Sequence, residues 1–282
     1  MNAIKPIIST AELLELQETA NLILVDATTG EQALETYRKE HLADALFVDM
    51  DNDLSVHGNP AKGGRHPLPE VRNFVSLLNK LGINNSSHVI VYDRAKGINA
   101  AARFWWMLSA LGHEKVQVID GGFQIAKALD YPISNGQETP RAPSSYQADQ
   151  WTLPQVDIST IEKYTQEQGS VIIDVRDENR YQGLHEPIDL IAGHIPTAIN
   201  IPLSLNLDAD GRFKTAEELR KLYTPYFKNQ NINKTAVHCG SGVSACHTLL
   251  ALKIAGLPLP ALYVGSWSEW SRNEKPIAKG KK

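Results

Sequence analysis

Short aliphatic and β-branched runs alternate with segments of helical spacing along this chain. In the second half they follow one another as runs at 171–175 and 199–201, a helical pattern at 215–226, a run at 235–238, a helical pattern at 243–253 and a run at 261–264. Such alternation predicts an α/β fold, in which a mainly parallel sheet is flanked by helices.

The same pattern occurs twice, because segments of the first half resemble segments of the second in the same order. The matching pairs are 22–26 with 171–174, 41–45 with 194–198, 89–93 with 235–239, and 121–123 with 265–267. Repeats of this size are domains rather than solenoid units. We therefore expect an N-terminal domain at 1–135, a proline-rich linker at 136–150 and a C-terminal domain at 151–282.

Cys239 lies where an apolar run enters a turn with two glycines and then a helical pattern. Small residues in such a turn let backbone N–H groups point at the sulfur, and the N-terminal end of the following helix favours negative charge. We expect Cys239 to be a nucleophilic thiolate. Cys246 falls among leucines of the predicted helix, and we expect it to pack in the core.

Two other interpretations of this segment are weaker. A zinc site at His238, Cys239, Cys246 and His247 would need cysteines three or four residues apart and side chains on one face, but the first two residues alternate along a strand. Residues 240–245 also match the G-x-G-x-x-A dinucleotide pattern, but that fingerprint belongs to the first strand of a longer domain.

The two copies differ at the position of the cysteine, where the first copy has Asp93 in place of Cys239. Only the second copy can therefore act as a nucleophile through sulfur. We expect the first copy to supply structure and one wall of a cleft, although a first domain with no role in the site is the alternative.

Composition limits the remaining classes. A chain of 282 residues with 42% hydrophobic content suits two domains of about 150 residues. A net charge of −4, with basic residues concentrated only in the tail 279–282, argues against nucleic-acid or membrane partners. Two cysteines are too few for a disulfide framework, and residues 1–6 lack a signal-peptide core. These features favour a cytoplasmic protein.

These residues resemble the tandem-rhodanese sulfurtransferases. Residues 239–245 are similar to the active loop of the 3-mercaptopyruvate sulfurtransferases, in which threonine is usual at the position of Ser244. Further similar segments are 120–122, 180–183, 193–196 and 265–270. The resemblance implies two rhodanese-like α/β domains, a catalytic cysteine only in the C-terminal one, and no metal or organic cofactor.

The resemblance also implies a reaction. A sulfane sulfur would pass from 3-mercaptopyruvate to a thiol or cyanide acceptor through a persulfide on Cys239, and thiosulfate is the alternative donor. The backbone amides of Gly240, Gly242, Val243 and Ser244 would hold the anionic persulfide. The partners would be small molecules, with a thioredoxin-like protein as a further acceptor.

Arg180 matches the arginine that binds the anionic end of the donor in this family, and a guanidinium suits carboxylate or thiosulfonate. The alternative is a surface ion pair with Asp177 or Glu178. A second arginine, common downstream in mercaptopyruvate enzymes, is absent from 185–189, so this segment is closer to the thiosulfate enzymes. Arg65 could replace it.

The resemblance also implies a proton relay of serine, histidine and aspartate for mercaptopyruvate. When mercaptopyruvate loses its sulfur, it becomes a pyruvate enolate that must be protonated. Ser241, His66 and Asp51 are the best counterparts, and histidine is suited to proton transfer near neutral pH. The alternative for His66 is an exposed loop residue.

Two other functional classes fit these residues less well. Phosphatases of related fold close the cysteine loop with an arginine, but Ala245 occupies that position here. A non-catalytic sulfur-binding module would not need Cys239, Ser241 and Arg180 together.

Overall fold

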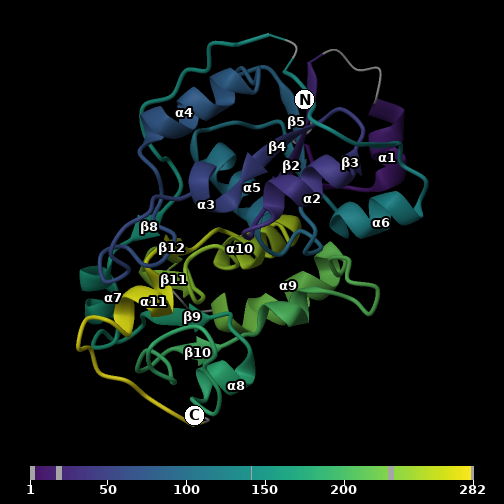
Figure 1. Ribbon diagram of the computed structural model, residues 1–282. Helices are drawn as coiled ribbons and strands as arrows, with labels where there is room; N and C mark the ends of the chain where they lie inside the picture. Colours follow the sequence, from purple (N-terminus) through teal and green to yellow (C-terminus); the bar gives the residue numbers. More distant parts are fainter. Residues whose placement is uncertain (1–3, 17–20, 141, 228–231, 281–282) are drawn as a thin grey trace. The chain divides into compact units, whose positions relative to one another are not determined.

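The computed structural model describes residues 4–16, 21–140, 142–227 and 232–280. Residues 1–3 of the N-terminal segment, residue 141 of the predicted linker and residues 281–282 of the basic tail lie outside the described residues. The chain forms two units, and each contains one five-stranded parallel sheet with helices (Figure 1). The first unit comprises Met1–Val56, Leu68–Leu153 and Asp210–Arg212, and the second His57–Pro67, Pro154–Ala209 and Phe213–Lys282.

The sheet of the first unit has the strand order β1-β6-β5-β2-β4, and every pairing in it is parallel. Leu24 and Val25 are adjacent on the inner strand β2 and both are buried, so both faces of the sheet are covered. The elements are β1 (Ile7–Ile8), α1 (Thr10–Leu16), β2 (Leu22–Thr28), α2 (Ala33–Lys39), β3 (His41–Leu42), β4 (Ala45–Asp49), α3 (Met50–Asp53), α4 (Val71–Lys80), β5 (His88–Tyr92), α5 (Ala100–Ala110), β6 (Val116–Ile119), α6 (Gly122–Ala128) and β7 (Ile133–Ser134).

The second unit repeats this topology with the strand order β8-β12-β11-β9-β10, again all parallel. The predicted strands and helices of this half are confirmed to within about two residues. The elements are β8 (Gln155–Val156), α7 (Ile158–Tyr164), β9 (Val171–Asp174), α8 (Glu178–Tyr181), β10 (Ile199–Asn200), the 3-10 turn η1 (Leu203–Asn206), α9 (Ala216–Phe227), the 3-10 turn η2 (Ile232–Lys234), β11 (Thr235–His238), α10 (Ala245–Ile254), β12 (Ala261–Tyr263) and α11 (Ser266–Trp270).

A histidine stacked on a tyrosine recurs in both units at matching positions of the repeat. In the first unit the rings of Tyr37 and His41 are 4.0 Å apart, and His41 Nδ1 lies 2.8 Å from the Tyr37 carbonyl. In the second unit the rings of Tyr181 and His194 are 3.8 Å apart, and His194 Nδ1 lies 2.7 Å from the Tyr181 carbonyl. The repeat read from the sequence therefore preserves buried contacts as well as strand order.

The units differ from the predicted domain ranges in the linker 136–150, in the loop 57–67, and at residues 151–153 and 210–212, which were predicted in the second domain but belong to the first unit. The segment predicted as a linker, 136–150, packs within the first unit, where the N–H groups of Ser144 and Tyr146 donate to Asn79 at 3.0 and 2.6 Å. Residues 57–67 were predicted in the first domain but belong to the second unit. The polar composition of the loop 57–67 did not indicate that this loop, which lies in the first half of the chain, would pack within the second unit.

Within the described residues, no helix is both long and apolar enough to cross a membrane.

Candidate active site

Cys239 follows directly after β11, and α10 begins six residues later at Ala245. The sulfur is almost fully buried, with 2% of the residue exposed, and the Gly242 N–H donates to it at 3.2 Å. Gly242 has a φ of +78°, and a Cβ there would lie 2.3 Å from the Val264 carbonyl oxygen. Glycine is therefore required at this position for the turn that points an amide at the sulfur.

The start of α11 fixes the cysteine loop in place. The Cys239 N–H donates to Ser266 Oγ at 3.2 Å, and the Cys239 carbonyl accepts from the Trp267 N–H at 3.0 Å. The Gly240 carbonyl accepts from the Ser268 N–H at 2.8 Å. Because these bonds involve backbone on both sides of the sulfur, the loop conformation is set before any substrate binds.

Asp93 occupies the corresponding place in the first unit. Its carbonyl accepts from the Phe123 N–H at 3.0 Å, the same length as the bond from Trp267 to Cys239. The Asp93 carboxylate accepts four backbone N–H groups at 2.7–3.2 Å, from Ala95, Gly97, Asn99 and Ala101. Burial raises the pKa of Asp93 although these bonds oppose the rise. The first loop thus surrounds a carboxylate with amides, where the second presents a sulfur.

The loop 57–67 brings two predicted site residues into the second unit. The Gly63 N–H donates to Glu269 Oε1 at 2.7 Å, and the Arg65 N–H donates to Ser268 Oγ at 3.0 Å, so the loop is attached to α11. His66 Nδ1 lies 2.8 Å from Ser241 Oγ. The structure therefore brings together the serine and histidine of the predicted relay, which are 175 residues apart in sequence.

Gly64 is the position at which this attachment is most easily broken. Gly64 has a φ of +83°, and a Cβ there would lie 2.4 Å from the Gly265 carbonyl oxygen. We expect Gly64→Ala to displace Arg65 and His66 and to lower kcat/KM by about tenfold or more, since strained or clashing backbone costs roughly 1–3 kcal/mol. Steady-state rates and thermal unfolding check this. Gly58→Ala is the matched control, because a Cβ there meets nothing within 4 Å, and an equal loss in both variants would contradict the expectation.

Asp51 lies on α3, in the first unit. Thr29 Oγ1 is 3.4 Å from its Oδ2, and its backbone carbonyl accepts from Ser55 Oγ at 2.8 Å. Its place in the relay stays a prediction.

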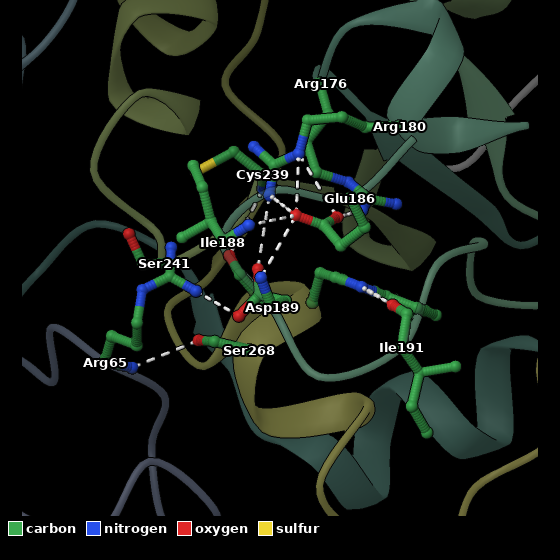
Figure 2. Close-up of polar contacts among 12 residues, drawn as sticks. Arg65, Arg176, Arg180, Glu186, Ile188, Asp189, Ile191, Cys239, Ser241 and Ser268 are labelled. Atoms are coloured by element: carbon green, nitrogen blue, oxygen red, sulfur yellow. Dashed lines mark hydrogen bonds and ion pairs between the residues drawn. The ribbon is translucent and has the colours of Figure 1, made fainter. Parts of the chain in front are cut away.

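Two guanidinium groups lie against the turn that follows Cys239. A Cβ added to Gly240 would be 3.2 Å from Arg65 Nη2 and 3.5 Å from Arg180 Nη2. Arg180 pairs with Glu186 at 2.7 Å and with Asp189 at 3.2 Å, and Arg65 also pairs with Asp189 (Figure 2). Arg65 thus lies beside Arg180, and its role as a replacement for the missing arginine stays a prediction.

Sequence reasoning missed Glu186 and Asp189, the acidic partners of these arginines. Burial would raise the pKa of Glu186, but hydrogen bonds from Arg180 and from the backbone hold it below its usual value. A possible signal was the departure of 185–189 from the family pattern, because this segment carries two acids where mercaptopyruvate enzymes carry an arginine.

A buried ionic network centred on Arg176 and Asp174 packs next to the site. Arg176 donates to Asp174 at 2.6 Å and to the Gly193 carbonyl at 2.7 Å, and its guanidinium lies 4.7 Å from the Trp267 ring centre. Burial opposes ionisation of Asp174, but the charges of Arg176 and His238 lower its pKa overall. Burial lowers the pKa of His238, although the nearby Asp174 carboxylate opposes this shift. The network holds together the carboxyl ends of β9 and β11, and Cys239 is the first residue after β11.

The zinc interpretation finds no support in the described part of the chain, where no group of three or more His, Cys, Asp or Glu side chains could hold a metal ion. Cys246 is fully buried in α10, with Sγ 3.5 Å from the Gly242 carbonyl. His247 stacks on Phe213 at 4.5 Å, and burial lowers its pKa to about 3. These two residues are part of the core, as predicted for Cys246.

Comparisons with known proteins agree with the repeat and the loop. The rhodanese-like domain family matches residues 9–128 and again 158–273. A probable 3-mercaptopyruvate sulfurtransferase of Pseudomonas aeruginosa is 35% identical over 284 residues, which cover 96% of this chain and 99% of that protein. A thiosulfate sulfurtransferase of Gallus gallus is 35% identical over 249 residues, covering 86% of this chain and 83% of that protein.

Among solved structures, the 3-mercaptopyruvate sulfurtransferase from Leishmania major is similar with a TM-score of 0.83 and 28% identity, over 96% of this chain and 75% of that chain. Both units therefore have the fold of one family, and relatives align along nearly the whole sequence. This chain belongs to the rhodanese-like family, as a tandem-domain sulfurtransferase.

Proposed function

We propose that this protein moves a sulfane sulfur from 3-mercaptopyruvate to a thiol or cyanide acceptor through a persulfide on Cys239, with thiosulfate as the alternative donor. The observation that carries the proposal is the placement of Cys239 Sγ in a turn with an inward amide at 3.2 Å, next to the glycine over which Arg65 and Arg180 lie. A nucleophilic sulfur beside two cations suits an anionic sulfur donor.

In the first step, the Cys239 thiolate attacks the sulfur of mercaptopyruvate. A sulfur–sulfur bond forms, the carbon–sulfur bond breaks, and its electron pair stays on carbon as the pyruvate enolate. Proton transfer through the Ser241–His66 pair, whose side-chain atoms are 2.8 Å apart, converts the enolate to pyruvate. The Cys239 persulfide then loses its proton and is held as an anion by the amides of the loop, Gly242 among them.

In the second step, an acceptor attacks the outer sulfur of the persulfide. A thiolate becomes a persulfide of its own, or cyanide becomes thiocyanate, and the bond between the two sulfurs breaks to return the Cys239 thiolate. Arg65 and Arg180 are 22% and 17% exposed at their side chains, so they are accessible to the donor carboxylate while their charge is only partly screened.

The names of the relatives support transfer of sulfur and include both donors, since one is called a mercaptopyruvate and another a thiosulfate enzyme. Neither Cys239 nor Cys246 is in a disulfide, which suits a reducing compartment. We therefore extend the proposal to a cytoplasmic location and to a thioredoxin-like protein as one acceptor.

Ser241→Ala separates the two donors. Thiosulfate leaves as sulfite, which needs no proton, whereas mercaptopyruvate leaves as an enolate that does. We expect the variant to lower kcat with mercaptopyruvate by roughly 100-fold, as loss of acid–base assistance typically does, and to change kcat with thiosulfate by less than about tenfold. Initial rates with cyanide as acceptor measure both.

Equal losses with the two donors would contradict the proton relay. In the wild-type protein, a strong preference for thiosulfate would overturn the choice of mercaptopyruvate while leaving sulfur transfer through Cys239 intact.

A further inference from the structure

We infer that Asp189 determines which donor charge the site prefers, by neutralising part of the arginine cluster beside Cys239. This inference rests on the proposed sulfur transfer and adds a specificity-determining residue to it. Asp189 is not a catalytic residue, because it acts on the donor through the arginines that it holds.

Asp189 is the meeting point of three guanidinium groups. Its side chain is 0% exposed, and it accepts from Arg180 at 3.2 Å, from Arg272 at 3.0 Å and also from Arg65. Figure 2 shows Asp189 between Arg65 and Arg180. One buried carboxylate thus fixes the spacing of the two arginines that lie over Gly240.

The arginines remain accessible while their common partner does not. Between 16% and 22% of each of the side chains of Arg65, Arg180 and Arg272 is exposed, against none for Asp189. A donor therefore meets the outer edges of the guanidinium groups, and it experiences Asp189 only through the net charge and position of the cluster.

The charges of the cluster nearly cancel. Four guanidinium groups face three carboxylates, which leaves one net positive charge; the groups are Arg65, Arg176, Arg180 and Arg272 against Asp174, Glu186 and Asp189. This single excess positive charge also faces the Cys239 thiolate, so the site tolerates a donor with one carboxylate, such as mercaptopyruvate, better than a donor with two negative charges. The second negative charge of thiosulfate would enter a partly buried site without a counter-charge, which disfavours it.

Asp189→Asn tests the inference, since asparagine keeps the shape and an acceptor oxygen but removes the charge. We expect the ratio of kcat/KM for thiosulfate to kcat/KM for mercaptopyruvate to rise about tenfold or more, through a lower KM for thiosulfate. The rise should shrink as ionic strength increases. Asp189→Glu restores the charge and should return the ratio to within about threefold of the wild-type value.

Two further variants keep the test independent of folding. Asp177→Asn makes the same charge change at an exposed helix cap and should leave the ratio unchanged, because asparagine also caps well. Arg272→Gln removes one positive charge from the cluster and should move the ratio in the opposite direction, against thiosulfate. Each ratio is measured within one preparation, so a partly unfolded fraction cancels from it.

An unchanged ratio in Asp189→Asn, or equal shifts in Asp189→Asn and Asp177→Asn, would overturn the inference while both donors still support wild-type turnover. Absence of wild-type turnover with both donors would instead overturn the proposed function itself.

Discussion

Cys239→Ser is expected to abolish sulfur transfer, with a fall in kcat of at least about a thousandfold. A serine hydroxyl is a far weaker nucleophile than a thiolate, and it cannot form the sulfur–sulfur bond that stores the transferred atom. Mass spectrometry after incubation with donor and no acceptor should show one added sulfur atom on the wild-type protein and none on the variant.

Cys246→Ser is the matched control for this experiment. Its sulfur is buried in α10 and contacts the Gly242 carbonyl, a bond that a serine hydroxyl can also make. We expect the control to retain most of the activity and the full gain of one sulfur. Equal inactivation of both variants, or uptake of sulfur by Cys239→Ser, would contradict the assignment of Cys239 as the carrier.

Arg180→Gln is expected to raise the donor KM and to lower kcat/KM by about 10- to 100-fold, because a hydrogen bond to a charged group contributes roughly 1.5–3 kcal/mol. Arg180→Lys should fall between wild type and glutamine, since lysine keeps the charge but not the planar fork. Steady-state kinetics with both donors provide the measurement, with rates normalised to the number of sites that accept sulfur.

Loss of Arg180 also removes a counter-charge from Glu186 and Asp189, whose side chains are 3% and 0% exposed. We therefore expect a lower thermal midpoint as well, which the normalisation to active sites separates from the effect on binding. Arg72→Gln serves as the control, because the side chain of Arg72 is 81% exposed and pairs only at the surface with Glu70. An unchanged KM in Arg180→Gln would remove this residue from the donor site.

Much of the architecture was predictable from local patterns. The β-branched runs mark β9 and β11 because a strand buried on both faces needs apolar residues at successive positions. The internal repeat predicted that both halves share one topology, which the two strand orders confirm. The turn after Cys239 was also predictable from its two glycines. The structure shows why glycine is needed at position 242, since the backbone there has a positive φ and the Val264 carbonyl leaves no room for a side chain.

The charged part of the site was not predictable in the same way. Arg65 and Asp189 are 124 residues apart in sequence and form an ion pair only because the loop 57–67 attaches to α11. Apart from the departure of 185–189 from the family pattern, nothing in the local sequence distinguishes Asp189 from an ordinary surface acid, although its side chain is fully buried among three arginines.

The sequence by itself determined the two α/β repeats, the cysteine at the end of a central strand of the second, and the aspartate that replaces it in the first. Only the tertiary structure decided that Arg65 and His66 belong to the second unit and that Asp189 joins the arginines beside Cys239. Hydrophobic periodicity reports how each segment is buried, whereas the meeting of distant charged side chains depends on how loops pack against helices. That packing leaves no periodic trace along the chain.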